Sequence, residues 1–201
     1  MRYAGLLNEA ADECQTALAL DRGDYLLHTC SFTLMQLNQP QAAMEFVRLD
    51  PNSEYAARSK AYIELREGKP LEALKSIQMI STDSPDREML KVDLFEACLD
   101  PSRRSSLDHY SRQAETEAMR APNQETKYFI GAILAYCGQR DAAARLIKSA
   151  IKHNYCAYTA LQTDPLWEKL RGSTKYSEVL LLAKECQSRF ATLRTGLRSD
   201  N

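Results

Sequence analysis

Residues Gln124 to Tyr155, QETKYFIGAILAYCGQRDAAARLIKSAIKHNY, carry the sequence pattern that decides the fold. Apolar residues recur here at spacings of three and four, which places them on one face of a helix, and Gly138 interrupts the pattern. The stretch therefore predicts two amphipathic helices joined by a tight turn. The small residues Gly131 and Ala143 would let the two helices pack closely, because a larger side chain at either position would hold them apart.

The same spacings recur elsewhere in the chain. The offset of five residues between Gly138 and Ala143 is repeated between Gly68 and Ala73 and between Gly5 and Ala10. A small residue stands twelve positions before the alanine in further stretches, and a large apolar residue or a cysteine stands four positions after it. Three sets of residues follow these rules: Ser31-Ala43-Val47, Ala61-Ala73-Ile77 and Ala10-Cys14. Such self-similarity predicts a chain of helical hairpins.

This pattern resembles the tetratricopeptide repeat (TPR), whose signature is a Leu-Gly pair, an aromatic residue, an alanine and a large apolar residue four positions later. Residues 54–85 and 124–155 carry the most specific match; Leu134 stands where the aromatic residue is usual, and Tyr155 where a proline is usual. The resemblance covers residues 1–194. It implies an all-α fold, a right-handed α-α superhelix (solenoid) of helical hairpins with a C-terminal capping helix.

We expect one TPR-like domain over residues 1–194, because the hairpins follow one another without a linker. It comprises a half repeat (1–22), hairpins at 23–52, 53–85, 86–122 and 123–155, and a capping segment (156–194). A flexible tail is expected at 195–201. The half repeat at the start indicates either a fragment of a longer protein, which we favour, or the loss of a preceding repeat.

Two places fit the repeat less well. In the hairpin 53–85, Lys60 and Glu64 occupy positions where apolar residues are expected, so either the helix is rotated or the loop at Gly68 is one residue longer. In the next hairpin, the stretch LDHYSRQAETEAMRA predicts a helix. Its row of alanines lies further along the chain from the alanine of the preceding hairpin than the length of a single repeat allows. We therefore expect an elongated loop from Asp100 to Ser106.

The capping segment contains helix start and stop signals. Asp164 is a candidate N-cap with Pro165 in the first turn, Gly172 can end that helix in a left-handed conformation, and Ser173 or Thr174 can cap a last helix from Lys175 to Leu193. The motifs Asp164-Pro165-Leu166 and Leu170-Arg171-Gly172 are similar to the end of TPR regions appended to bacterial serine/threonine kinases and winged-helix regulators. That resemblance implies a signalling or regulatory parent protein.

Composition restricts the class of function. Lys and Arg number 26 and Asp and Glu 27, so the net charge of −1 offers no basic excess for nucleic acid. No apolar run reaches the length of a membrane span. The six cysteines show no Cys-x-x-Cys pair. We interpret them as small core residues of a reduced, cytoplasmic protein, although an even number also permits disulfides.

Candidate binding residues form three stripes with four-residue spacing on the predicted first helices, which line the concave side of such a solenoid. Together they predict an aromatic and basic groove for a protein or peptide partner, acidic or ending in a carboxylate. The alternative is that the aromatic rings pack between hairpins while the arginines are solvated. The residues of the groove are His28, Phe32, Gln36, Arg58, Tyr62, Arg66, Tyr128 and Tyr136.

No catalytic pattern is present in the sequence. The three histidines lack metal-ligand spacing, and no phosphate loop or nucleophile elbow occurs. We therefore expect a non-catalytic interaction scaffold without cofactor or metal, a monomer or weak dimer that binds no nucleic acid or membrane. The alternative is a structural or oligomerisation segment whose N-terminal half repeat packs on another copy or domain.

Overall fold

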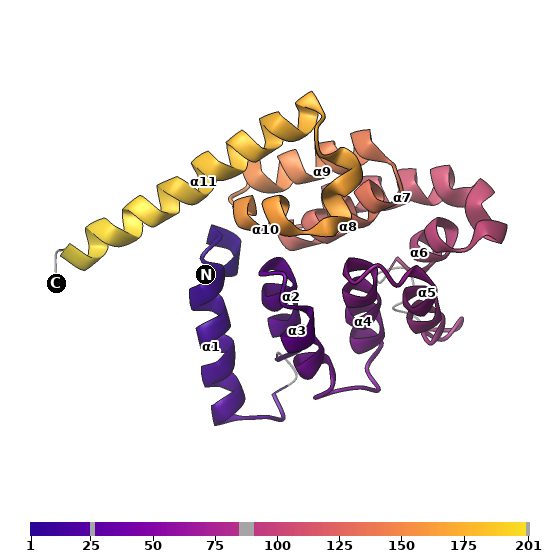
Figure 1. The fold of residues 1–201 in the computed structure, drawn as a ribbon, viewed down its shortest axis with the longest axis horizontal. Helices are drawn as coiled ribbons and strands as arrows, with labels where there is room; N and C mark the ends of the chain where they lie inside the picture. The colour runs from indigo at the N-terminus through magenta and orange to yellow at the C-terminus, as the bar shows by residue number, and fades with distance from the viewer. Residues whose placement is uncertain (25–26, 85–90, 200–201) are drawn as a thin grey trace. The chain divides into compact units, whose positions relative to one another are not determined.

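The computed structural model describes residues 1–24, 27–84 and 91–199, with side chains up to residue 193. These residues are all-helical, as the sequence predicts (Figure 1). The elements are η1 (Arg2–Ala4), α1 (Leu7–Leu20), α2 (His28–Gln36), α3 (Pro40–Val47), α4 (Glu54–Arg66), α5 (Pro70–Gln78), α6 (Val92–Leu99), η3 (Pro101–Ser106), α7 (Leu107–Arg120), α8 (Gln124–Tyr136), α9 (Arg140–Lys152), α10 (Tyr158–Thr163), η4 (Pro165–Leu170) and α11 (Thr174–Ser199).

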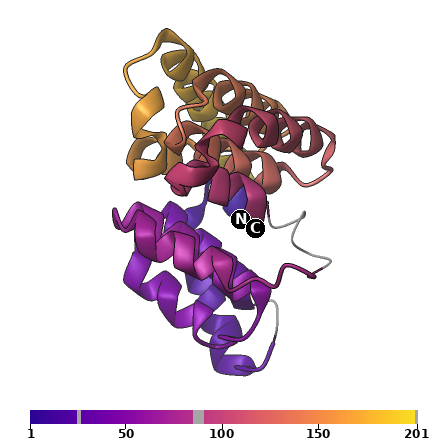
Figure 2. The ribbon, with the colours of Figure 1, turned by 90° about the vertical axis from the view of Figure 1, so that its right-hand side faces the viewer.

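The chain divides into two compact units, and the single domain expected over residues 1–194 stays a prediction. We call residues 11–114 the N-terminal unit and residues 1–10 with 115–201 the C-terminal unit. In the N-terminal unit, α2 packs on α3 and α4 on α5, and the two hairpins contact each other through α2, α3 and α4 (Figure 2). In the C-terminal unit, α8 packs on α9, and both contact η4.

The three hairpin turns have one conformation. Asn38, Gly68 and Gly138 each adopt a positive φ, of 56°, 73° and 88°. In each turn, the residue after this position donates its N–H to a carbonyl five residues back, as in Gln139 to Leu134 at 2.8 Å. This is the Schellman motif, in which a left-handed residue satisfies the last carbonyls of a helix. The same bonds recur around Gly5, which follows η1.

The predicted small positions are buried at the helix crossings. Ala43, Ala73 and Ala143 are fully buried, as are Ser31 and Ala61 in the facing helices. A Cβ added to Gly131 would lie 3.5 Å from the Ala143 carbonyl oxygen and 3.0 Å from the Trp167 ring. Close helix approach at these positions is thus confirmed.

The hairpin 53–85 shows why polar residues can occupy repeat positions. Ala61 is buried at the small position of the repeat, and Gly68 forms the same turn as Gly138. The loop at Gly68 therefore contains no inserted residue. Glu64 is also buried, and it accepts a hydrogen bond of 2.6 Å from the Ser76 hydroxyl of α5 and pairs with Lys60 at 3.7 Å. A satisfied carboxylate therefore replaces the expected apolar contact.

One expectation of irregular backbone was wrong. Asp100 to Ser106 is not an open loop, because residues 101–106 form the 3-10 helix η3, which Asp100 caps by accepting the Ser102 N–H at 2.8 Å. Helix α11 extends to Ser199, and the flexibility expected of residues 195–201 stays a prediction. The repeat pattern also predicts Pro85 at the end of a repeat and Leu90 on the inward face of a helix, and both residues lie outside the described residues.

The capping segment follows its sequence signals. Asp164 accepts the Leu166 N–H at 3.0 Å at the start of η4, and Gly172 has a φ of 78°. Ser173 accepts the Tyr176 N–H at 3.2 Å at the start of α11. The apolar face of η4, formed by Leu166, Trp167 and Leu170, is buried.

The cysteines are not reduced, which corrects the sequence interpretation. All six lie in the described residues, and none is a free thiol. Cys14 of α1 is bonded to Cys30 of α2, and Cys156 is bonded to Cys186 of α11. The sequence identified several of these positions as buried, but burial alone cannot distinguish a small apolar thiol from half of a disulfide.

Candidate binding site

The predicted groove residues divide between the two units. His28, Phe32 and Gln36 lie on α2, and Arg58, Tyr62 and Arg66 lie on α4, which contacts α2 in the N-terminal unit. Tyr128 and Tyr136 lie on α8 in the C-terminal unit. The stripes on α2 and α4 thus lie on neighbouring helices of one unit, whereas the stripe on α8 belongs to the other unit.

Tyr62 and Arg66 do not form an accessible platform. Tyr62 is 1% exposed, and its ring packs edge-on against Phe95 at a centroid distance of 5.2 Å. Arg66 is 9% exposed; its Nη1 lies 3.6 Å from the Met35 sulfur and donates to the Tyr62 carbonyl at 3.3 Å. Both side chains therefore belong to the interior, and of the stripe on α4 only Arg58 is partly exposed.

Tyr128 has a structural role as well. It is fully buried, and its ring lies 5.5 Å from that of Tyr155 and 5.7 Å from that of Trp167. Its hydroxyl donates to Asp164 Oδ2 at 2.9 Å. This bond ties α8 to the start of η4, so the packing alternative describes Tyr128 correctly.

The other aromatic residue of that stripe is partly accessible. Tyr136 is half-buried, and burial raises its pKa above the ordinary value for tyrosine. The Lys169 ammonium lies 5.2 Å from the ring centroid and donates to the Tyr136 carbonyl at 2.5 Å. Tyr136 already has a cation on its ring, which leaves less of the ring available to a partner.

On α2, the three predicted residues differ in exposure. Gln36 and Phe32 are buried, so neither side chain offers much surface to a partner. His28 is half-exposed at the start of the helix, and its ring makes an edge contact of 6.4 Å with Phe32. The accessible part of this stripe is therefore its N-terminal end.

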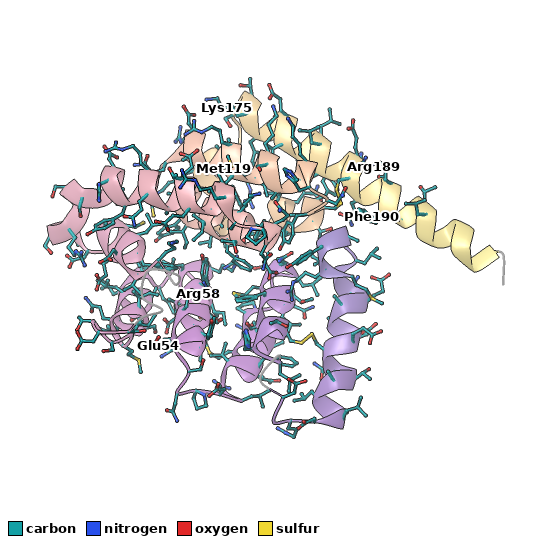
Figure 3. All side chains as sticks on the ribbon, turned by 180° about the vertical axis from the view of Figure 1, so that it is seen from behind. Glu54, Arg58, Met119, Lys175, Arg189 and Phe190 are labelled. Atoms are coloured by element: carbon teal, nitrogen blue, oxygen red, sulfur yellow. A yellow bond between two sulfur atoms is a disulfide. The ribbon has the colours of Figure 1, made fainter. Side chains whose placement is uncertain are left out.

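Three partly exposed residues of α2 and α4 meet the buried Phe32 ring in a group that we call the Arg58 cluster: His28, Phe32, Tyr55 and Arg58. The Arg58 guanidinium carbon lies 6.0 Å from the centroids of both the Phe32 and Tyr55 rings, within cation–π range. His28 lies 5.4 Å from Tyr55. Figure 3 shows Arg58 and Glu54 on α4.

Local sequence explains how the cluster is positioned. Ser53 caps α4 by accepting the Tyr55 N–H at 3.2 Å, which fixes the first turn. Tyr55 and Arg58 are three residues apart and so share a helix face. The sequence analysis omitted Tyr55, although this spacing to Arg58 was available as a signal.

The guanidinium of Arg58 has unused hydrogen-bonding capacity. Its Nε is buried without a hydrogen-bond partner among the described residues, whereas the side chain as a whole is half-exposed. An arginine that is held between two rings and lacks a carboxylate can make paired hydrogen bonds to an incoming carboxylate. Of the predicted residues, Arg58 thus has the geometry of a binding group.

The described residues contain neither a metal-binding group nor a membrane-spanning helix. In the described part of the chain, no group of three or more His, Cys, Asp and Glu side chains is placed to hold a metal ion. Across residues 1–24, 27–84 and 91–199, no helix is both long and apolar enough to cross a bilayer. Comparisons of the chain with family models, with curated proteins and with solved structures found no match.

Proposed function

We propose that this chain is a non-catalytic protein-interaction module that binds a peptide or protein partner through the Arg58 cluster. The observation that supports this most strongly is the half-exposed Arg58 side chain, whose guanidinium carbon lies 6.0 Å from the Phe32 and Tyr55 ring centroids and whose buried Nε has no partner among the described residues. The partner group that fits is a carboxylate, because a guanidinium presents paired N–H donors to its two oxygens.

The fold proposed for this module is a TPR-type solenoid. The support is the repetition of one turn conformation at Asn38, Gly68 and Gly138, each followed five residues later by a fully buried alanine. In the N-terminal unit, successive hairpins also pack on each other, as repeats of a solenoid do. A right-handed superhelix, closed by the segment 156–194, is part of this proposal, as is a role within a larger signalling or regulatory protein.

The competing function is assembly through the N-terminal half repeat. Against it, residues 2–5 are engaged within the C-terminal unit. The Tyr3 carbonyl accepts the Cys156 N–H at 2.7 Å, the Gly5 carbonyl accepts Gln187 Nε2 at 3.2 Å, and Arg2 pairs with Glu125 at 2.6 Å. Because residues 2–5 already make these contacts within the chain, they are less available for contact with a second copy. Partner binding is therefore the better-supported function.

The disulfides change the compartment that we propose. Disulfides persist in oxidising compartments and are rare in the cytosol. Since Cys14–Cys30 and Cys156–Cys186 each join separate parts of the fold, we propose that the module works in an oxidising compartment in place of the cytoplasm expected from the sequence.

A charge reversal at the cluster tests the proposed function. Arg58→Glu is compared with Arg48→Glu, an exposed arginine after α3 that lies outside the cluster. Both proteins are checked by circular dichroism, and captured proteins from the source cells are quantified by mass spectrometry. We expect Arg58→Glu to lose a defined set of partners that Arg48→Glu and the native chain retain. Identical sets from all three would refute the proposal.

A further inference from the structure

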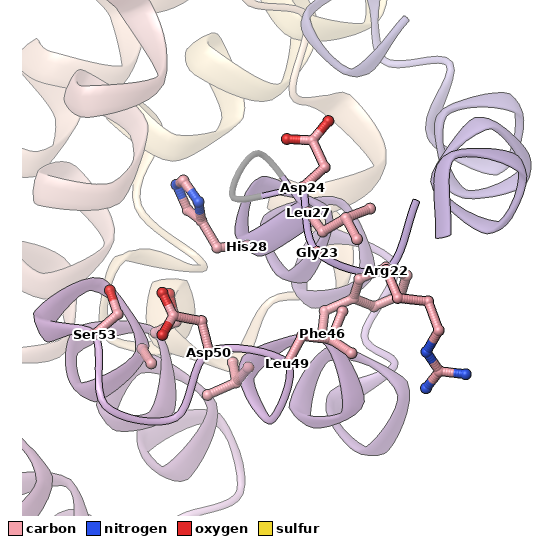
Figure 4. A pocket seen from close by; sticks show the side chains of 12 residues that line it. Arg22, Gly23, Asp24, Leu27, His28, Phe46, Leu49, Asp50 and Ser53 are labelled. Carbon is pink, nitrogen blue, oxygen red and sulfur yellow. The ribbon is translucent and has the colours of Figure 1, made fainter. Parts of the chain in front are cut away.

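The pocket in Figure 4 does not by itself indicate a class of ligand. It has a volume of about 260 Å³, lies in the N-terminal unit and includes Arg22, Asp24 and Asp50 in its lining. These side chains carry charges of both signs, so the pocket selects neither a cation nor an anion. The C-terminal unit contains a more informative site, because it is occupied by residues 1–5 of the chain itself, which we call the Arg2 segment.

The occupied site recognises an arginine. Arg2 lies against Glu125 at the start of α8, with its Nε 2.6 Å from one carboxylate oxygen and its Nη2 3.0 Å from the other. Two parallel contacts of this kind match the planar guanidinium, whereas a lysine ammonium offers a single point of charge. Glu125 is only 7% exposed, so a cation beside it is needed to offset its burial.

An aromatic ring and a glycine complete the ligand. The Tyr3 ring lies 5.1 Å from the Tyr155 ring, and the Tyr3 hydroxyl donates to Asn123 Oδ1 at 2.9 Å. The Tyr3 carbonyl accepts the Cys156 N–H at 2.7 Å. A Cβ added to Gly5 would lie 2.5 Å from the Cys156 carbonyl oxygen, so this position excludes a side chain. The site thus fits an arginine, an aromatic residue, any third residue and a glycine, in that order.

The receiving side of the site is held in place by contacts that do not involve the Arg2 segment. Asn123 caps α8, because its Oδ1 accepts the Glu125 N–H at 2.9 Å, and this bond fixes the turn that carries the carboxylate. The Tyr155 ring lies 5.5 Å from the ring of Tyr128, which is fully buried in α8. The site would therefore keep its carboxylate and its aromatic ring in position if the segment left it.

The Arg2 segment itself is held less firmly. No residue of η1 is buried, and Tyr3 is 41% exposed. The segment therefore gains little from apolar burial, and its polar contacts are individually weak because water competes for the same groups. If it left, Tyr155, which is 1% exposed, would lose the ring that covers it, and Glu125 would lose its cation. The open site would be complementary to another segment with the same pattern.

We propose that the Arg2 segment is an internal ligand of the C-terminal unit, and that a partner protein replaces it with a segment of its own that carries an arginine, an aromatic residue and a glycine at the same spacing. The site takes a cation, whereas the Arg58 cluster takes a carboxylate, so this is a second binding function beyond the proposed one. A second copy of the chain is a less suitable donor, since its own segment is tethered beside its own site at a high effective concentration.

A peptide with the sequence of residues 1–6, MRYAGL, tests the site. It carries a fluorophore at its C-terminus, and its anisotropy is measured with the native chain and with the double variant Arg2→Ala/Tyr3→Ala of the full chain. We expect saturable binding to the double variant and binding at least about tenfold weaker to the native chain, because the apparent affinity falls with the fraction of open sites. No saturable binding to the folded double variant, or equal affinity for both proteins, overturns the proposal.

Two substitutions connect this binding to the carboxylate. In the double variant, Glu125→Gln should abolish binding, whereas Glu178→Gln at an exposed position of α11 should leave it unchanged. A peptide in which glutamate replaces the arginine should not bind. Peptide binding that survives Glu125→Gln contradicts the site. Circular dichroism shows whether the variants fold; if the double variant does not, Tyr3→Ala alone should still bind the peptide more tightly than the native chain does, and equal binding overturns the proposal.

Two further measurements separate this proposal from its neighbours. Light scattering should show a monomer of the native chain; a dimer that dissociates in the double variant would mean that a second copy supplies the segment, which overturns the assignment to a partner. If the peptide fails to bind while partner capture still requires Arg58, the internal ligand is wrong and the proposed function stands. If the peptide binds but capture ignores Arg58, the reverse holds.

Discussion

The disulfide Cys156–Cys186 should contribute substantially to the stability of the C-terminal unit. It joins the segment after α9 to α11, and it closes a loop with a sequence separation of 30. The chain-entropy relation for such a loop gives roughly 3.7 kcal/mol at 25 °C. The bond Cys14–Cys30, with a separation of 16, gives roughly 3.1 kcal/mol by the same relation. Replacing both members of either pair with alanine should lower the free energy of unfolding by about these amounts.

Urea unfolding followed by circular dichroism measures both effects. Because the two bonds lie in different units, the losses should add in the quadruple variant. Dithiothreitol should lower the urea midpoint of the native chain. It should lower the urea midpoint of the quadruple variant by a smaller amount. A thiol titration in urea without reductant should detect no free cysteine. The reasoning is refuted if that titration finds free thiols, or if reductant leaves the native midpoint unchanged.

Three further predictions concern single side chains. Ala143→Leu should destabilise the chain by roughly 1–3 kcal/mol through overpacking, and Ala19→Leu at an exposed position of α1 should not; equal urea midpoints for the two variants would contradict the helix crossing. Arg66→Glu should cost about 3 kcal/mol because it leaves a buried carboxylate unpaired, so a melting temperature equal to that of the native chain would show that the side chain is not internal. Lys175 lowers the pKa of Asp141 through a hydrogen bond of 2.6 Å and by charge. The stabilisation from this depressed pKa is present above the unfolded-state pKa and is lost as the pH falls through the folded-state pKa. Lys175→Ala should raise the pKa of Asp141 in an NMR titration, and an unchanged pKa would rule out the pair.

The sequence predicts the hairpins well because their signals are local. A left-handed residue such as Gly68 and the buried alanine five positions later belong to one turn and the start of the next helix, so both can be read within a short window. The caps at Ser53 and Asp164 are equally local. The 3-10 helix η3 was missed because the sequence pattern showed a break in the repeat and not the cap at Asp100.

The candidate site was harder to predict because burial depends on distant segments. Four-residue spacing shows that Arg58, Tyr62 and Arg66 share a face of α4, but it does not show where along the helix that face is covered. Tyr62 is covered by Phe95, and Tyr128 bonds to Asp164, 36 residues away. The disulfide partners are also far apart in the chain, so spacing gave no indication of them.

A photocrosslinking experiment tests the central claim, that the Arg58 cluster contacts the partner. Benzoylphenylalanine replaces Tyr55, which lies in the cluster, or Tyr158 of α10, which is also half-exposed but lies in the C-terminal unit. Irradiation with source-cell proteins should yield a defined crosslinked protein from position 55, absent from position 158 and lost when Arg58→Glu is added. Crosslinks of the same protein from both positions, or a crosslink at 55 that persists with Arg58→Glu, would contradict the account.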